Sequence, residues 1–217
     1  TDGGQVVSYA MGSWPPPLGI EYRVDSANAF VAFIVAAMAL VVIPYSRVCI
    51  GAEVRAEEHY LFYALLMLCL TGLLGILLTG DAFNLFVFLE ISSLSTYVLI
   101  AMGRDRRALV AAYQYLLMGT IGASLYVIGV GMLYLETGTL NLADMASRLH
   151  MADTRALLAG LAFITVGVSL KIALFPLHLW LPNAYAYSPS SVSAFLAATA
   201  TKVSIYVLMR FFFTIFG

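Results

Sequence analysis

The stretch HYLFYALLMLCLTGLLGILLTGDAFNLFVFLEISSLSTYVLIA, residues 59–101, decides the fold of this chain. It contains two apolar runs, 59–79 and 82–101, with only Gly80 and Asp81 between them. A helix must be about 20 residues long to cross roughly 30 Å of hydrocarbon at about 1.5 Å per residue. The stretch therefore predicts two membrane-spanning helices joined by a two-residue connector.

Four further apolar runs of spanning length lie on either side of this pair, at residues 27–45, 109–135, 156–177 and 191–213. The whole chain is 62% hydrophobic and only 11% charged, with a mean hydropathy of +0.92. Soluble domains carry about 25% charged residues. We therefore expect an all-α integral membrane protein of about six spans, with a polar external segment at 1–26 and a transmembrane domain at 27–217.

Charge and cysteine content exclude several classes of function. The net charge of −1 offers no basic surface for nucleic acid. Cys49 and Cys69 lie in separate apolar runs, which predicts neither a disulfide framework nor a metal site. The chain opens with Thr1 rather than Met, which favours an N-terminus truncated relative to the whole protein.

The distribution of arginines predicts the orientation, because short cytoplasmic loops retain positive charge. Two arginines follow the first span and three follow the third, so both loops are placed in the cytoplasm (Arg47, Arg55, Arg104, Arg106 and Arg107). Three arginines with acidic neighbours remain for the opposite face (Arg23, Arg148 and Arg155). Both ends of the chain are then expected outside.

The fifth span carries two prolines and two cationisable side chains in the run KIALFPLHLWLP, residues 171–182. Proline removes a backbone donor and clashes with the preceding turn. We expect the helix to be interrupted near Pro176, with a loop reaching residue 190. Such breaks occur at the ion sites of transporters, although a simple proline kink near a helix end explains the pattern as well.

Three charged residues lie well inside predicted spans, namely Glu90, Lys171 and Lys202, whereas the arginines lie in loops or near a helix end. A charge at the centre of a membrane helix costs at least about 2.5 to 3.5 kcal/mol, so these side chains need partners. Glu90 is expected to pair with one lysine. The other lysine then lacks an acidic partner in this chain, and a buried lysine that can lose its proton can also relay one.

Intramembrane charges are functional by default, and we interpret these three as proton-translocating residues. The alternative is a set of packing salt bridges that fix helix register. His178 could pass protons onward from Lys171, or be hydrogen-bonded at the interface near Trp180. Asp81 could admit protons, but it is explained as well by capping of the third span.

Polar and small side chains support the charged set. Hydroxyls near Glu90 can hold water or link helices (Ser92, Ser93, Ser95 and Thr96). Small residues in the fourth span permit close helix packing (Gly119, Gly122, Ala123, Gly129 and Gly131).

Several segments make the chain resemble a known family. TGDAFNLFVFLE at 79–90, KIALFPLHLWLP at 171–182 and SAFLAATATKV at 193–203 are similar to the antiporter-like subunits of respiratory complex I and of the Mrp cation/proton antiporters. Together with AYQY at 112–115 and GTLN at 138–141, they most resemble the Mrp D subunit.

The resemblance implies two inverted five-helix repeats, each forming a half-channel, joined by a central chain of charged residues and water. It assigns Glu90, Lys171 and Lys202 to the translocation path. This chain would supply one repeat and the helix before it, so either it is a fragment or a separate polypeptide supplies the rest. The implied location is the bacterial plasma membrane, with other membrane subunits as partners.

Three functions follow from these observations. The first is a proton-translocating subunit of a multisubunit Na⁺ or K⁺/proton antiporter. The second is a proton-pumping subunit of a complex I-like NADH-quinone oxidoreductase or membrane hydrogenase. The chain shows no cysteine set for an iron-sulfur cluster and no dinucleotide-binding loop, so no cofactor or catalytic site is predicted within it. The third is a non-conducting assembly subunit with inert charges.

Overall fold

The computed structural model of the chain describes residues 6–149 and 154–217. Its elements, in chain order, are β1 (Val7–Ala10), η2 (Met11–Ser13), β2 (Glu21–Val24), α1 (Ser26–Glu53), η3 (Ala56–Glu58), α2 (His59–Leu78), α3 (Ala82–Ala101), α4 (Arg106–Thr137), α5 (Leu142–Arg148), α6 (Thr154–Ile172), α7 (Trp180–Tyr187), α8 (Ser190–Ala198), α9 (Ala200–Met209) and the π-helical turn η5 (Arg210–Ile215).

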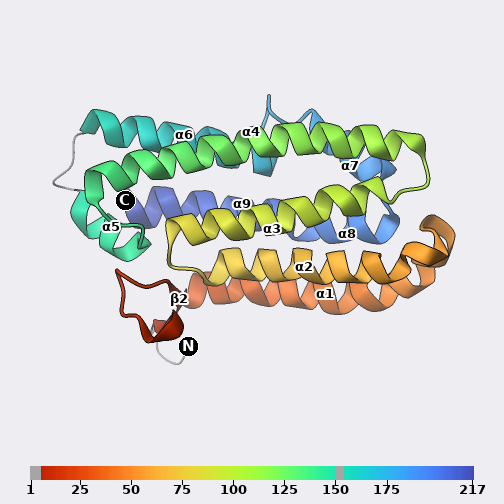
Figure 1. Ribbon diagram of the computed structural model, residues 1–217, viewed down its shortest axis with the longest axis horizontal. Coiled ribbons are helices and arrows are strands. Elements are labelled where there is room, and N and C mark those ends of the chain that lie inside the picture. Colours follow the sequence, from red (N-terminus) through yellow and green to blue (C-terminus); the bar gives the residue numbers. More distant parts are fainter. Residues whose placement is uncertain (1–5, 150–153) are drawn as a thin grey trace.

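Six helical segments of the described chain are long and apolar enough to cross a membrane. They are Ser26–Glu53, Ala56–Leu78, Ala82–Ala101, Arg106–Thr137, Arg155–Ile172 and Ser190–Ile215. The segments lie alongside one another in a bundle, with α1 and α2 at one side, α4 and α6 at the other, and α3, α8 and α9 between them (Figure 1). The expected all-α membrane fold with six spans is confirmed.

The two ends of the bundle differ in what they carry. The antiparallel hairpin of β1 and β2, helix α5 and the C-terminus lie at one end (Figure 1). The loops that follow α1 and α3 lie at the other, so Arg55 and Arg104 share an end as the sequence predicted. Which end faces the cytoplasm stays a prediction. Residues 6–24 of the predicted external segment form the hairpin region, and residues 1–5 lie outside the described part.

The start of α1 is tied to two other spans at the hairpin end. Asp25 caps α1 by accepting hydrogen bonds from the backbone N–H groups of Ala27 and Asn28, and it also pairs with Arg210, the first residue of η5. Burial by itself raises the pKa of Asp25, but the hydrogen bonds from Arg210 and from the α1 backbone outweigh burial and lower it. Asn28 donates to the carbonyl of Leu77 at 2.9 Å, which fixes α1 against α2.

Helices α4 and α6 form the most extensive helix pair, because glycines let their backbones approach. A Cβ atom added to Gly167 would lie 2.5 Å from the Gly122 carbonyl oxygen. Real Cβ atoms do not come so close, so both positions require glycine for this packing. A Cβ atom added to Gly131 of α4 would have no atom within 4 Å, so the packing of α4 does not require glycine at this position.

Three features of the backbone differ from the sequence-based expectation. The helix expected over 156–177 ends at Ile172, the residue whose carbonyl the ring of Pro176 would meet in a continued helix. The run 191–213 is interrupted at Thr199, which separates α8 from α9. The connector after the fourth span contains α5, which is capped by Asn141.

Candidate functional site

Lys171, near the end of α6, lies inside the bundle beside three polar groups of α3. Its ammonium donates a 2.7 Å hydrogen bond to the Ser93 hydroxyl and lies 3.4 Å from the Tyr97 phenol oxygen. The carboxylate of Glu90 is 3.6 Å from the same nitrogen, an ion pair longer than a hydrogen bond. The side chains of Lys171 and Glu90 are 5% and 25% exposed. The expected pairing of Glu90 with one lysine is therefore present.

The spacing along α3 explains why these groups converge. Glu90, Ser93 and Tyr97 stand three and four positions apart, and residues with that spacing line one face of a helix. The face is directed at Lys171, so one helix supplies a carboxylate, a hydroxyl and a phenol to one ammonium. Tyr97 was not identified from the sequence. Its place on the same helical face as Glu90 is the signal that would have found it.

Aromatic rings hold Tyr97 and the end of α6 in place. Tyr97 meets Tyr115 edge-on with ring centroids 4.7 Å apart, and Tyr115 stacks on Trp180 at 4.0 Å. Trp180 in turn donates from its indole nitrogen to the Leu170 carbonyl at 3.0 Å. This row of rings links α3, α4 and α7, and it satisfies a carbonyl of α6 next to Lys171.

A cavity of about 20 Å³ borders Lys171 and has room for one water molecule. Its polar lining combines Ser92, Ser93 and Thr96 of α3 with Ser204 of α9. A buried water needs two to four polar partners, and these hydroxyls and the ammonium supply them. The cavity therefore extends the polar surroundings of Lys171 from α3 toward α9.

The segment 173–179 after α6 is non-helical, as Pro176 predicted, but the loop expected to reach residue 190 instead contains helix α7, which includes Pro182. Ala173 has a φ of 61°, and the Phe175–Pro176 peptide bond is cis. Phe175 and Leu179 are 85% and 73% exposed in the chain by itself. Non-helical backbone at membrane depth persists where protein or a wet cavity covers it, so this segment marks a face that requires a neighbour.

Lys202 lies apart from the Lys171 site. It projects from α9 into a groove of about 380 Å³ between α1 and α9, whose walls include Phe30 and Ile34. Its ammonium donates to the Ala197 carbonyl, and in the described part of the chain it forms no ion pair with a carboxylate. The structure thus brings Lys171 and Glu90 together, but it leaves Lys202 exposed on another side of α9, so the expected burial of the second lysine is not found in this chain.

The two further candidates have local surroundings. His178 is in the non-helical segment, where its ring lies 5.5 Å from that of Phe175, and its buried Nδ1 has no hydrogen-bond partner in the described chain. Asp81 caps α3 by accepting a 2.7 Å hydrogen bond from the Asn84 backbone N–H. Burial raises the pKa of Asp81, and the backbone N–H groups of Asn84 and Phe83 oppose that rise.

Comparison with known proteins places this geometry in a family. Residues 79–217, which contain α3, Lys171 and Lys202, match the family model described as "NADH:quinone oxidoreductase/Mrp antiporter, TM". The N subunit of the NADH-quinone oxidoreductase of Desulforudis audaxviator is 47% identical over 95% of this chain and 41% of its own length. The D subunit of the Na⁺/H⁺ antiporter of Bacillus subtilis is 34% identical over all of this chain and 43% of its own length.

A solved structure carries the same fold. A chain of the Mrp complex from Dietzia sp. DQ12-45-1b superposes with a TM-score of 0.86 at 27% identity, over 96% of this chain and 39% of that one. The chain thus spans about two fifths of the length of the relatives it matches. Because the family model covers more than half of its residues, the chain belongs to the NADH:quinone oxidoreductase/Mrp antiporter transmembrane family.

Proposed function

We propose that this chain is the first half-channel part of a proton-translocating membrane subunit in a multisubunit monovalent cation/proton antiporter. The observation that carries the proposal is the buried contact of Lys171 with Glu90. Two opposite charges inside an apolar bundle offset each other's desolvation, and their separation changes which of them holds a proton. The similarity to the D subunits of Na⁺/H⁺ antiporters supports the same function.

The geometry suggests how Lys171 exchanges its proton. While Glu90 is ionised, it stabilises the ammonium from one side, and Ser93 and Tyr97 accept hydrogen bonds from the others. When Glu90 is neutralised or displaced, the ammonium loses its only carboxylate partner in the described chain, and a water in the adjoining cavity can take the proton toward Ser204. The pair is thus a two-state electrostatic switch.

Lys202 would act at a later step and in a different setting. Its groove between α1 and α9 is open in this chain. In relatives more than twice as long, further chain is available to cover it. We assign Lys202 to the onward path on this basis, with His178 and Asp81 as secondary relay candidates. Other membrane subunits are the expected partners, since the matched structures are multisubunit assemblies.

The test is proton flux into vesicles that contain the complete protein with its accompanying subunits, under an imposed Na⁺ or K⁺ gradient. Glu90→Gln and Lys171→Ala should abolish cation-driven flux while assembly remains intact. Glu57→Gln is the matched control, because Glu57 is an exposed carboxylate of η3, before helix α2 begins. Unchanged flux in both bundle variants would overturn the proposal and leave the charges as structural, in a non-conducting assembly subunit.

A second candidate function is proton pumping in a redox-driven complex, and the 47% identity to the N subunit of an NADH-quinone oxidoreductase favours it. The Lys171 switch would be the same, but electron transfer elsewhere in the complex would drive it. Co-purification with a flavin or iron-sulfur protein would support this reading. Flux that follows an imposed Na⁺ or K⁺ gradient in the absence of any electron donor would support the antiporter.

A further inference from the structure

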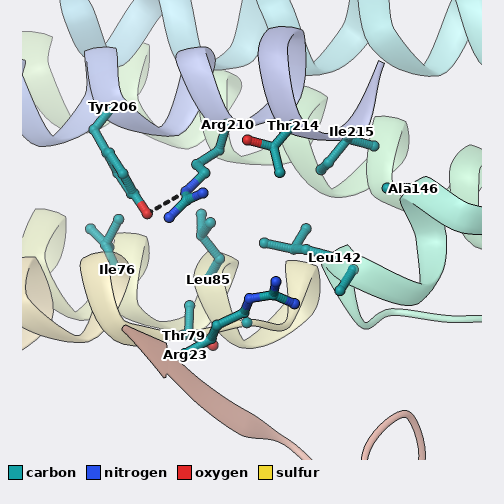
Figure 2. Close-up of a pocket in the computed structure, with 12 residues that line it drawn as sticks. Arg23, Ile76, Thr79, Leu85, Leu142, Ala146, Tyr206, Arg210, Thr214 and Ile215 are labelled. Atoms are coloured by element: carbon teal, nitrogen blue, oxygen red, sulfur yellow. Dashed lines mark hydrogen bonds between the residues drawn. The ribbon is translucent and has the colours of Figure 1, made fainter. Parts of the chain in front are cut away.

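A second cavity, of about 220 Å³, lies at the hairpin end of the bundle, away from Lys171. It is enclosed by β2, the adjoining ends of α2 and α3, α5 and η5 (Figure 2). One part of its wall is apolar, formed by Leu85, Leu142 and Ile215 among others. The other part carries Arg23, Arg210 and the hydroxyl of Thr214.

The two arginines reach the cavity from opposite sides, Arg23 from β2 and Arg210 from η5 (Figure 2). Arg210 is paired with Asp25 and donates to the Tyr206 phenol oxygen at 2.6 Å. No carboxylate in the described part of the chain pairs with Arg23. Glu21 lies nearby against Gly80, and its carboxylate accepts a hydrogen bond from Ser8 at 3.0 Å.

Arg23 is half-buried, and within the described residues its guanidinium makes no side-chain hydrogen bond or ion pair, so a ligand with oxygen acceptors would satisfy it. Arginine presents five N–H donors in a fixed fork, which matches carboxylate and phosphate oxygens. A cation would be repelled by the two guanidinium groups, whereas a phosphate group between them could accept from both. Some of the N–H donors of Arg210 are already bonded to Asp25 and Tyr206. Arg23 should therefore provide most of the energy of phosphate binding.

The apolar wall decides between a free ion and a lipid. Inorganic phosphate gains nothing from Leu85, Leu142 and Ile215, but the glycerol and first methylenes of a phospholipid would bury against them. The cavity is lined by residues near the adjoining ends of the spanning helices α2 and α3, and the ends of membrane helices lie near the lipid headgroups. We propose that this cavity binds the phosphate of an anionic phospholipid headgroup through Arg23 and Arg210, with its glycerol against the apolar wall.

The experiment uses the complete protein, extracted in detergent with its accompanying subunits and freed of native lipid. Phosphatidylglycerol, phosphatidylcholine and inorganic phosphate are titrated separately, and bound lipid is counted by native mass spectrometry while the thermal midpoint is followed. Phosphatidylglycerol should bind with at least tenfold higher affinity than phosphatidylcholine, because the ammonium of the latter meets the same guanidinium groups.

Arg23→Gln should weaken phosphatidylglycerol binding about tenfold, as expected for the loss of a charged hydrogen-bond donor. Arg47→Gln removes the same charge from an exposed site beyond the cavity and should change nothing. Ala146→Trp fills the cavity from α5 without altering charge, and it should also block the lipid. If Arg23→Gln fails to fold, Ala146→Trp still tests whether the lipid binds in this cavity.

Three results would overturn the proposal. If inorganic phosphate binds in an Arg23-dependent way and phosphatidylglycerol does not, the site takes a free anion and the lipid assignment is wrong. If phosphatidylglycerol binds equally to Arg23→Gln, Arg47→Gln and the unmodified protein, the arginines form no site. If Ala146→Trp binds the lipid with unchanged affinity, the headgroup lies elsewhere on the surface.

Discussion

The Lys171 ammonium donates a 2.7 Å hydrogen bond to the Ser93 hydroxyl, which is nearer to it than the Glu90 carboxylate at 3.6 Å. The ion pair therefore does not hold Lys171 by itself. Ser93 is a neutral acceptor that remains in place when the charge on Glu90 changes, and it borders the water-sized cavity as well. It is placed to stay bonded to Lys171 in both states of the proposed switch.

Ser93→Ala should reduce proton flux about tenfold without abolishing it, because a hydrogen bond to a charged group contributes about 1.5 to 3 kcal/mol. Flux in vesicles measures the effect. Ser95→Ala is the matched control, since Ser95 is buried on the same helix and donates to the carbonyl of Ile91 within its own helix. Equal flux in the two variants would show that Ser93 has no role at Lys171.

Gly119→Ala should displace Tyr97 and destabilise the bundle, because a Cβ atom at Gly119 would lie 1.9 Å from the Tyr97 phenol oxygen. Overpacking of this kind costs about 1 to 3 kcal/mol of unfolding free energy. Gly131→Ala in the same span meets nothing and should be neutral or slightly stabilising. Unfolding in mixed detergents measures both variants, and adding Tyr97→Phe to Gly119→Ala should restore part of the loss.

Asp81→Asn tests whether Asp81 caps a helix or carries protons. Burial raises the pKa of Asp81, so its contribution to stability falls as pH rises from 3.8 toward the higher pKa of the folded state. Asparagine keeps the cap but carries no charge. We expect Asp81→Asn to lose this pH dependence, to be at least as stable as the unmodified protein at neutral pH, and to retain proton flux. Loss of flux with stability intact would instead make Asp81 part of the pathway.

Asp25→Asn should destabilise the hairpin end at neutral pH but not in acid. Hydrogen bonds lower the pKa of Asp25 in the folded state, so its stabilising contribution is complete above the ordinary value of 3.8 and is lost as pH falls through the folded pKa. The unfolding free energies of the variant and the unmodified protein should therefore begin to approach each other below pH 3.8 and meet below the folded pKa of Asp25. Asp105→Asn is a matched control, because Asp105 also caps a helix but forms no ion pair with a distant span in the described chain.

The sequence predicted the spans and the charged site for the same physical reason. Length and hydropathy reveal which segments enter lipid, and Glu90 and Lys171 stand out because charge is costly there. Tyr97 did not stand out, since a phenol is unremarkable in a membrane helix and only its contact with Lys171 gives it a role. The separation of Lys202 from Lys171 was also invisible, because it depends on how α9 is rotated against α1 and α3.

Local backbone breaks were predicted unevenly. Pro176 predicted the break after α6, because the ring of a proline clashes with the preceding turn of a helix. The interruption at Thr199 carries no such residue, and alanines on either side favour a continuous helix. Tertiary packing between α8 and its neighbours therefore outweighs local preference at Thr199, and a single sequence does not contain that information.

The interruption at Thr199 gives Lys202 a second kind of influence. Its ammonium bonds to the Ala197 carbonyl, which belongs to α8, while Lys202 itself belongs to α9. The Lys202 ammonium thus connects α8 and α9 across the break at Thr199. Besides placing a charge in the groove between α1 and α9, Lys202 therefore holds two separate helices together. A substitution at Lys202 would remove a contact between α8 and α9 together with a charge, so a flux measurement on such a variant reports both losses.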